Sequence, residues 1–395
     1  MHVLLLGVGR QGKGALYDLA HSPGVEQVIA ADLDLGALEA YVAGRGWGRR
    51  VECLRLDADD PRSLEAALQS GADVVIDLLP ARYAVRVGRA AIENRLHAVN
   101  TVPCTPEFAA LDPMARDAGV TLLPEFGLAP GIDLVMLGDA ARGFEAITEI
   151  VSYAGGVPVA GTADNPIRYR ASWNLHGLLA SYRRGGTVVE DGAVREIGDR
   201  EQFAPGNLHE VEVRGVGRME AYPDGDVMRY LEIMGLAPEA LRRAGRYVLR
   251  WPGHAAFWHA AVGLGLLDEG SVEVDGVMVD RRDYLASALE PALRYDGEDR
   301  DMAIVRVEVA GLHQGRGQVA VYQVVDTRDR VTGLSAMSRL VGFTASIGAQ
   351  MIAGGALALP GLLSPAVDVP LVPFELALAE REIGVEVHYY DDISA

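Results

Sequence analysis

The chain has only two cysteines, Cys53 and Cys104, among its 395 residues. Two thiols cannot form the dense disulfide framework of a small secreted domain, so reduced cysteines are the expected state. The sequence also lacks the basic segment and the small-residue cleavage site of a signal peptide, because Met1 and His2 lead directly into an apolar run. These absences predict a cytoplasmic protein.

Basic residues are also scarce. Lys and Arg together number 36 against 55 Asp and Glu, so the formal net charge is −19. A chain this acidic repels a phosphate backbone, and nucleic acid is therefore excluded as an expected partner. Residues 340–367 contain no charge and are long enough to cross a bilayer, but several glycines and Pro360 interrupt them. We interpret this stretch as a buried helix and expect no membrane association.

Two further kinds of site are missing. The histidines at positions 97, 209, 259 and 388 have no spacing suited to a metal, and neither cysteine belongs to a Cys-x-x-Cys pair. We therefore predict no structural or catalytic metal. No Gly-x-Ser-x-Gly element is present, so the sequence gives no support for esterase chemistry.

Hydrophobic residues make up 49% of the chain and charged residues 23%, which is ordinary globular composition. In residues 1–134, apolar strand patterns alternate with helical spacing. This alternation predicts a doubly wound parallel sheet, that is, a Rossmann domain of the α/β class. The expected strands are 2–6, 27–31, 51–57, 72–80, 97–101 and 120–124, and the expected helices include 61–69, 83–93 and 106–118.

The first strand leads into a glycine-rich turn that contains Gly7, Gly9 and Gly12, with Arg10 and Gln11 between the last two glycines. A helical pattern follows, so the Gly-x-Gly-x-x-Gly motif lies between a strand and a helix, as dinucleotide binding requires. Gly7 permits a tight turn, Gly9 lets the backbone approach a pyrophosphate, and Gly12 lets the helix pack closely on the strand. The free N–H groups of the helix would bind the phosphates.

Asp32 ends the second strand, 20 residues after Gly12. A carboxylate there accepts hydrogen bonds from the adenosine ribose and repels a 2′-phosphate, and the next residue is Leu33 rather than Arg. Both facts favour NAD over NADP. Further cofactor contacts are expected where later strands end, at Asp57, Leu79 and Pro80. The alternative is a Rossmann-like domain that has lost its ligand.

After Pro124 the pattern changes. Residues 135–332 predict an α+β domain with a mainly antiparallel sheet, inserted into the chain for substrate binding and dimerisation. Its expected strands are 147–153, 187–189, 209–213, 271–279, 304–309 and 318–325, and its expected helices are 238–243, 255–266 and 281–289. Residues 333–395 are expected to return to the Rossmann domain, beginning with a helix that runs to Ala358.

Several motifs outside the glycine loop resemble one family. Residues 127–133 read Gly-Leu-Ala-Pro-Gly-Ile-Asp, residues 165–173 contain Asn-Pro, Tyr and Ser-Trp at matching spacing, and residues 249–254 read Leu-Arg-Trp-Pro-Gly-His. These are similar to motifs of the saccharopine dehydrogenases of the glutamate-forming type, and the likeness extends over nearly the whole chain. Within that family the length and the Pro-Gly-His element are most similar to the L-lysine 6-dehydrogenases.

The resemblance implies oxidation of a C–N bond with a nicotinamide cofactor. Saccharopine enzymes often carry Arg in a Tyr-Pro-Asn-Arg-Asp motif, but residues 222–226 here read Tyr-Pro-Asp-Gly-Asp. An Arg would suit one of the extra carboxylates of saccharopine. Its loss favours a smaller amino acid. The resulting hypothesis is that L-lysine and NAD⁺ give 2-aminoadipate 6-semialdehyde, ammonia and NADH.

This reaction needs a base for the ε-ammonium and partners for the far end of the substrate. His254 is the first candidate base because its ordinary pKa suits proton transfer, followed by Glu125 and Tyr230. Each has a structural alternative, such as a His that caps the next helix. Arg250 and Arg170 are candidates for the substrate carboxylate, Asp226 for its amine and Trp173 for a wall of the site.

Two other readings stay open. One is a saccharopine-type or carboxyspermidine-type reductase, which joins an aldehyde to a second amine. The other is a non-catalytic NAD-sensing protein. In the enzyme readings the partner is a small amino-acid substrate, and a homodimer or higher homo-oligomer is expected because closed two-fold dimers are the commonest assembly.

Overall fold

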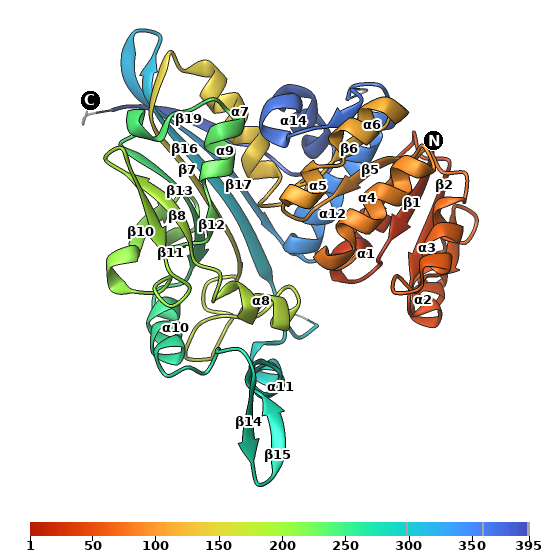
Figure 1. Ribbon diagram of the computed structural model, residues 1–395, viewed down its shortest axis with the longest axis horizontal. Helices are drawn as coiled ribbons and strands as arrows, with labels where there is room; N and C mark the ends of the chain where they lie inside the picture. The colour runs from red at the N-terminus through yellow and green to blue at the C-terminus, as the bar shows by residue number, and fades with distance from the viewer. Residues whose placement is uncertain (298, 358, 393–395) are drawn as a thin grey trace. The chain divides into compact units, whose positions relative to one another are not determined.

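A computed structural model describes residues 1–297, 299–357 and 359–392 and divides the chain into two compact units (Figure 1). Unit 1 comprises Met1–Val135 and Ser338–Glu382, and unit 2 comprises Met136–Met337 together with the residues from Ile383 onward. The predicted fold class is confirmed: one unit holds a parallel Rossmann-like sheet, and the other holds a mainly antiparallel sheet.

The sheet of unit 1 is parallel throughout, in the order β18-β6-β5-β4-β1-β2-β3. The strands are β1 (His2–Leu6), β2 (Gln27–Asp32), β3 (Val51–Arg55), β4 (Val74–Asp77), β5 (His97–Asn100), β6 (Thr121–Leu123) and β18 (Gly361–Leu362). Central strands such as β1 and β4 are buried along their length because helices cover a doubly wound sheet on both faces. Their apolar runs are therefore nearly continuous.

The helices of unit 1 are α1 (Arg10–His21), α2 (Leu35–Arg45), α3 (Pro61–Leu68), α4 (Ala84–Glu93), α5 (Pro106–Ala109), α6 (Asp112–Ala118), most of α12 (Ala336–Ala353), α13 (Pro365–Asp368) and α14 (Leu371–Ala379), with a 3-10 turn at Ala81–Tyr83. The expected single helix 106–118 was wrong, since α5 and α6 are separate. Thr105 caps α5 by accepting the Phe108 N–H at 3.2 Å. Pro113 lies in the first turn of α6, where its missing N–H ends any continuation from α5.

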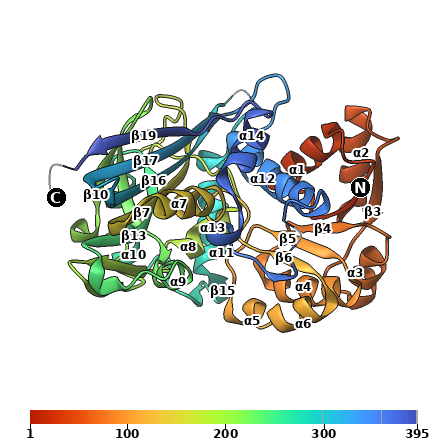
Figure 2. The ribbon, with the colours of Figure 1, turned by 90° about the horizontal axis from the view of Figure 1, so that it is seen from above.

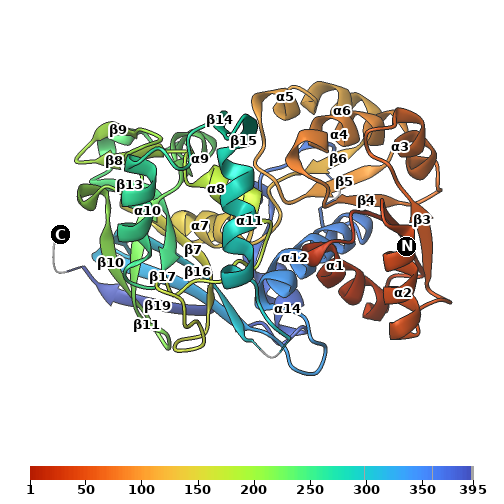
Figure 3. The ribbon, with the colours of Figure 1, turned by 90° about the horizontal axis from the view of Figure 1, so that it is seen from below.

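The returning helix α12 packs closely on α1, and the two lie side by side in Figure 3. A Cβ on Gly14 of α1 would lie 1.9 Å from the Ser338 carbonyl oxygen, and one on Gly342 would lie 2.4 Å from the Ala15 nitrogen. The glycines that interrupt the uncharged stretch thus permit helix contact. In the part of the chain that the structure describes, no helix is long and apolar enough to cross a membrane. Ala358, the expected end of this helix, lies outside the described residues.

The sheet of unit 2 follows the order β10-β11-β13-β7-β16-β17-β19, with β8, β9 and β12 on a branch. Its strands are β7 (Ala146–Pro158), β8 (Gly186–Glu190), β9 (Ala193–Ile197), β10 (His209–Val213), β11 (Gly217–Pro223), β12 (Gly225–Asp226), β13 (Arg243–Arg250), β16 (Asp301–His313), β17 (Arg316–Thr327) and β19 (Glu386–Asp391). Among the described strands of this sheet, only β13–β7 and β12–β8 pair in parallel. Not all of 333–395 returns to the Rossmann domain, because β19 pairs with β17 in unit 2 (Figure 2).

The chain enters unit 2 through α7 (Ile132–Gly143), and the other helices of this unit are α8 (Leu175–Ser181), α9 (Met228–Ile233), α10 (His254–Gly263) and α11 (Arg281–Leu293). Two elements of this unit differ in the structure from those predicted by the sequence. The helix predicted at 238–243 is a single 3-10 turn, Pro238–Ala240, because Arg243 already pairs with Glu149 in the sheet. The strand predicted at 271–279 is a hairpin of β14 (Ser271–Val274) and β15 (Val277–Asp280).

Candidate functional site

Four strands of unit 1, two on each side of β1, end in the same way at the carboxyl edge of the sheet. In each case a side-chain oxygen accepts the backbone N–H two residues further on, at 3.0–3.1 Å. The acceptors are Asp32, Asp57, Asp77 and Asn100. These local turns close each strand and place polar groups along the edge where open α/β sheets bind ligands.

The glycine loop joins this edge between β1 and α1. Gly7 has a φ of +86°, and a Cβ on Gly12 would lie 2.0 Å from the Gly7 carbonyl oxygen, so neither position tolerates a side chain. A Cβ on Gly9 would meet nothing within 4 Å. No side chain caps the start of α1, and Gln11 Oε1 is buried without a hydrogen-bond partner among the described residues. The open approach at Gly9 and the free N–H groups at the start of α1 fit a pyrophosphate.

Asp32 ties the second strand to this loop. One of its carboxylate oxygens accepts the Val8 N–H at 2.7 Å, and the other accepts the Asp34 N–H at 3.1 Å. The next side chain, Leu33, is 60% exposed. The position after the carboxylate therefore supplies no positive charge for a 2′-phosphate.

Asp77 and Glu125 are the two buried acids at this edge. Burial raises the pKa of Asp77 to about 7, and the hydrogen bond from the Leu79 N–H opposes this shift in part. Leu79 and Pro80 complete the turn after β4. Glu125 follows β6 with a φ of +60°, an uncommon backbone conformation for Glu, and its N–H donates to the Val102 carbonyl.

Unit 2 contains a separate buried cluster around Arg250 and His254. Arg250 ends β13 and is 5% exposed, while His254 begins α10 and is fully buried. The Tyr169 ring contacts both: its centre lies 4.7 Å from the Arg250 guanidinium carbon and 4.9 Å from the centre of the His254 ring. His254 Nε2 lies 2.9 Å from the Tyr182 hydroxyl.

The buried charge of Arg250 in this cluster lacks, within the part of the chain that the structure describes, the ion-pair partner that usually accompanies a buried charge. Among the described residues, no carboxylate forms an ion pair with Arg250, which donates a hydrogen bond to the Leu249 carbonyl at 2.8 Å. Burial and the Arg250 charge hold the pKa of His254 well below its usual range, so its imidazole is neutral. Burial raises the pKa of Asp224, although the charges of Arg184, Arg246 and Arg250 oppose the shift.

His254 does not cap its helix through its own side chain. Glu220 does so instead, because its carboxylate accepts the N–H groups of Gly253 and Ala255 at 3.0 and 2.6 Å. The sheet register places Glu220 opposite Arg250. The capping role considered for His254 is therefore filled by another residue.

Three other candidates have partners of their own. Arg246 donates to the Tyr230 hydroxyl at 3.1 Å. Arg170 forms ion pairs with Asp299 at 2.6 Å and Asp164 at 3.5 Å. Asp226 is exposed and accepts the Met228 N–H at 2.8 Å at the start of α9.

Trp173 is half-buried and packs against the apolar cluster that contains Tyr169 and Trp258. Asp224, like Asp226, was a candidate partner for the substrate amine, whereas sequence reasoning missed Tyr169, Tyr182 and Tyr222. Tyr169 and Tyr222 lay inside the motifs compared above. Tyr182 gave no signal because its partner, His254, is 72 residues away. No group of three His, Cys, Asp or Glu side chains suited to a metal occurs among the described residues.

Comparisons with known proteins place both units in one family. The model of the "Saccharopine dehydrogenase NADP binding domain" matches residues 3–123, and that of the "Saccharopine dehydrogenase C-terminal domain" matches residues 127–381. A saccharopine dehydrogenase [NADP(+), L-glutamate-forming] of Schizosaccharomyces pombe is 26% identical, covering 99% of each chain. The mitochondrial alpha-aminoadipic semialdehyde synthase of Bos taurus is 24% identical over 92% of this chain and 45% of its own.

Solved structures show the same fold. The apo saccharopine dehydrogenase (L-Glu forming) of Saccharomyces cerevisiae matches with a TM-score of 0.85 and 22% identity, covering 98% of this chain and 99% of that one. The homospermidine synthase of Legionella pneumophila, in complex with NAD, matches with a TM-score of 0.63 and 13% identity over 99% and 91%.

Proposed function

Because this chain belongs to the saccharopine dehydrogenase family, we propose that it oxidises the side-chain amine of L-lysine with NAD⁺. The match to this family supports binding of a nucleotide cofactor and amino-acid oxidoreductase chemistry, which its relatives share. The choice of lysine and the choice of NAD are the parts that this chain's own residues must support.

The observation that carries the substrate proposal is the uncompensated charge buried in unit 2. Arg250 has no carboxylate partner among the described residues. Asp224 is half-buried, forms an ion pair with Arg184 at 3.6 Å, and lies close enough to Arg250 for the two charges to interact. One guanidinium and one carboxyl group match the carboxylate and ammonium of a single amino-acid head. Gly225, with a φ of +86°, stands where saccharopine enzymes often carry Arg, so this position offers no partner for a second substrate acid.

The same cluster helps to assign the base. The carboxylate carbon and the ε-amine of an extended lysine are about 7 Å apart. Arg250 and His254 both contact Tyr169, so they would serve the same end of the substrate. The proton of the ε-ammonium must then go to another group. We assign this role to Glu125, which, like Asp77, is a buried acid at the carboxyl edge that holds the glycine loop.

When bound, the nicotinamide would accept the hydride. The chain's own residues would do the rest. Arg250 binds the substrate carboxylate, neutral His254 and Tyr182 fix its orientation, and Glu125 takes the proton that frees the amine lone pair. Trp173 and the tyrosines exclude water during hydride transfer. One water molecule must then enter and add to the imine carbon, which gives the semialdehyde and ammonia.

Steady-state kinetics separate these roles. Glu125→Gln should lower kcat by about 100-fold with little change in KM, which is the usual scale for a general base. His254→Gln should mainly raise KM. If His254→Gln lowers kcat and Glu125→Gln does not, the two roles are reversed.

The preference for NAD departs from the relatives, whose names specify NADP(+). It is supported by the Asp32 carboxylate, which would repel a 2′-phosphate, and by Leu33 after it. Fluorescence titration should show NADH binding at least ten times more tightly than NADPH. Asp32→Ser should remove most of this difference. Asp34→Ala is the control, because Asp34 caps α2 by accepting the Ala37 N–H and has no expected contact with the ribose. Equal affinities in the unaltered protein would refute the NAD proposal.

A second candidate, the saccharopine-forming reductase, is favoured by the names of relatives that match over their whole length. Absorbance at 340 nm distinguishes the two. Purified protein with L-lysine and NAD⁺ alone should produce NADH. If lysine gives none while the semialdehyde plus glutamate consumes NAD(P)H, the saccharopine reaction is correct and the lysine proposal is wrong.

A further inference from the structure

A loop of unit 2 brings one polar side chain, Gln202, into the protein interior. The loop comprises residues 198–204 and joins β9 to a 3-10 turn at Pro205–Asn207. Gln202 is 1% exposed, and neither its amide oxygen nor its amide nitrogen has a hydrogen-bond partner among the described residues. A buried amide without partners costs free energy, and most buried polar groups in folded proteins are paired. The Gln202 amide is therefore suited to bind a group from outside the chain.

Gln202 lies at the border of the cluster around Arg250. Phe203, the next residue in the chain, packs against the rings of Tyr182 and Tyr222, whose centres lie 5.2 and 4.7 Å from its own. The Tyr222 ring centre in turn lies 5.9 Å from the Arg250 guanidinium carbon. The loop thus adjoins the residues that are proposed to hold the head of an amino acid.

Gln202 and Asp224 form a polar pair at this border. Asp224 Oδ2 pairs with Arg184 at 3.6 Å, whereas Asp224 Oδ1 is buried without a hydrogen-bond partner in the described chain. Burial raises the pKa of Asp224, and the charges of neighbouring arginines together with the Gln202 amide oppose this shift. The amide N–H groups of Gln202 therefore face the Asp224 carboxyl group, and the amide oxygen is left to accept a hydrogen bond.

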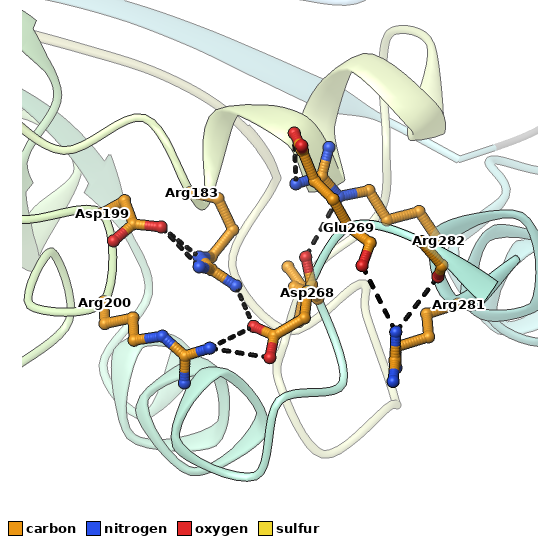
Figure 4. A network of polar contacts seen from close by, with 9 residues as sticks. Arg183, Asp199, Arg200, Asp268, Glu269, Arg281 and Arg282 are labelled. Carbon is orange, nitrogen blue, oxygen red and sulfur yellow. Dashed lines mark hydrogen bonds and ion pairs between the residues drawn. The ribbon is translucent and has the colours of Figure 1, made fainter. Parts of the chain in front are cut away.

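Ion pairs fix the first part of this loop, as Figure 4 shows. Arg183, which directly follows Tyr182, donates from Nε to Asp199 at 3.1 Å and also pairs with Asp268. Arg200 binds the same Asp268 carboxylate at 2.7 Å. Since Arg183 follows α8 and Asp268 lies between α10 and β14, the loop is tied to the ends of both helices. A binding group whose backbone is fixed in advance loses less conformational entropy when its ligand arrives.

We propose that Gln202 is a specificity-determining residue that recognises, together with Asp224, the α-ammonium group of the substrate. An ammonium has three N–H donors, and Gln202 Oε1 and Asp224 Oδ1 are acceptors without a partner among the residues that the structure describes. Arg250 binds the carboxylate of the same head. The site then rejects a carboxylic acid that lacks the amine, because its own buried acceptors would stay unpaired. The inference rests on the proposed function, which makes this cluster the amino-acid site.

Two unreactive analogues test the ammonium contact without turnover. L-Norleucine has the head of lysine but no ε-amine, and hexanoate lacks the α-amine as well. Calorimetric titration in the presence of reduced nicotinamide cofactor should show norleucine binding to the full chain at least about 100-fold more tightly than hexanoate. Gln202→Met should weaken norleucine binding about tenfold and leave hexanoate binding within about twofold. An unchanged ratio of the two affinities in Gln202→Met would overturn the proposal.

Gln323 provides a matched control for the folding of the variant. It is also buried in unit 2, but its amide donates to the Arg214 carbonyl at 2.9 Å and accepts from Arg306 at 3.3 Å. Gln323→Met should lower the urea midpoint of unfolding and leave the ratio of affinities unchanged. Gln202→Met should leave the midpoint unchanged or higher, because it removes an amide that has no partner in the described chain. If both variants lower the midpoint equally, Gln202 is structural and the proposal is wrong.

Failure of this proposal is distinguishable from failure of the proposed reaction. If lysine yields NADH but Gln202→Met keeps the unaltered ratio of norleucine to hexanoate affinity, the reaction stands and the role of Gln202 is refuted. If lysine yields no NADH but the ratio falls as expected, the ammonium contact stands and only the proposed reaction is wrong.

Discussion

The buried charged side chains of the two units differ in whether they have an ion-pair partner. In unit 1, Asp18 of α1 is buried and fully engaged: Arg381 donates to both of its oxygens at 2.6 and 2.9 Å, and Ser346 and Gln350 bind the same carboxylate. In unit 2, Arg250 is equally buried but has no ion-pair partner among the described residues. A buried charge that its own chain pairs becomes costly when its partner is removed, whereas one left without a counter-ion is suited to bind an ion from outside.

The largest expected effect comes from breaking the buried ion pair between Asp18 and Arg381. Asp18→Ala should lower the free energy of unfolding by about 3–5 kcal/mol, because it leaves the Arg381 guanidinium buried without its acid. Urea unfolding measures this change. Glu190→Ala is the control: it breaks the exposed Arg195 pair in unit 2 and should cost less than about 1 kcal/mol. Similar costs for the two variants would show that the Asp18 network has no special role.

The next largest effect concerns Arg250, the buried charge that has no ion-pair partner in the described part of the chain. Arg250→Met should leave the free energy of unfolding unchanged or slightly higher, because an apolar side chain replaces a buried charge that lacks a partner. The same variant should raise KM for lysine by about 100-fold, the scale of a lost charge-assisted hydrogen bond. Arg170→Met provides the contrast. It leaves the Asp299 carboxylate without its ion-pair partner, so it should lower the free energy of unfolding without changing KM for lysine. If Arg250→Met unfolds the protein, Arg250 is structural.

The smallest expected effect comes from Asp77, a buried acid with a single backbone donor. Its pKa in the folded chain is raised to about 7, above the ordinary value near 4. The stability that this group contributes is therefore fully present below about pH 4 and is lost as pH rises through 7. Above pH 7 its carboxylate also adds negative charge at the edge where phosphates would bind.

Titration of NAD⁺ at pH 6, 7 and 8 tests this expectation. Affinity should fall about threefold across the range, and Asp77→Asn should bind with a flat pH profile. The variant should also show less loss of stability between pH 6 and 8 than the unaltered protein. A pH profile that is unchanged in Asp77→Asn would assign the titration to another group.

Much of the nucleotide edge could be predicted because its signals are local. Gly7, Gly9 and Gly12 lie within six residues, and Asp32 falls at a fixed distance after them. The NAD assignment and the roles of the candidate residues remain predictions. The errors in the elements had identifiable causes. Pro113 separates α5 from α6, where one helix was expected. The turn at Asp275 and Gly276 makes a hairpin of the expected strand, and Arg243 pairs within the sheet instead of ending the expected helix.

The sequence by itself determined the family, the α/β class and the glycine loop, because each depends on residue types at short, regular spacing. Tertiary structure alone decided which charges are paired and which are left open. Asp18 and Arg381 are 363 residues apart, and Tyr182 and His254 are 72 apart. No local spacing records such contacts, since they exist only once sheets and helices bring distant segments into one core.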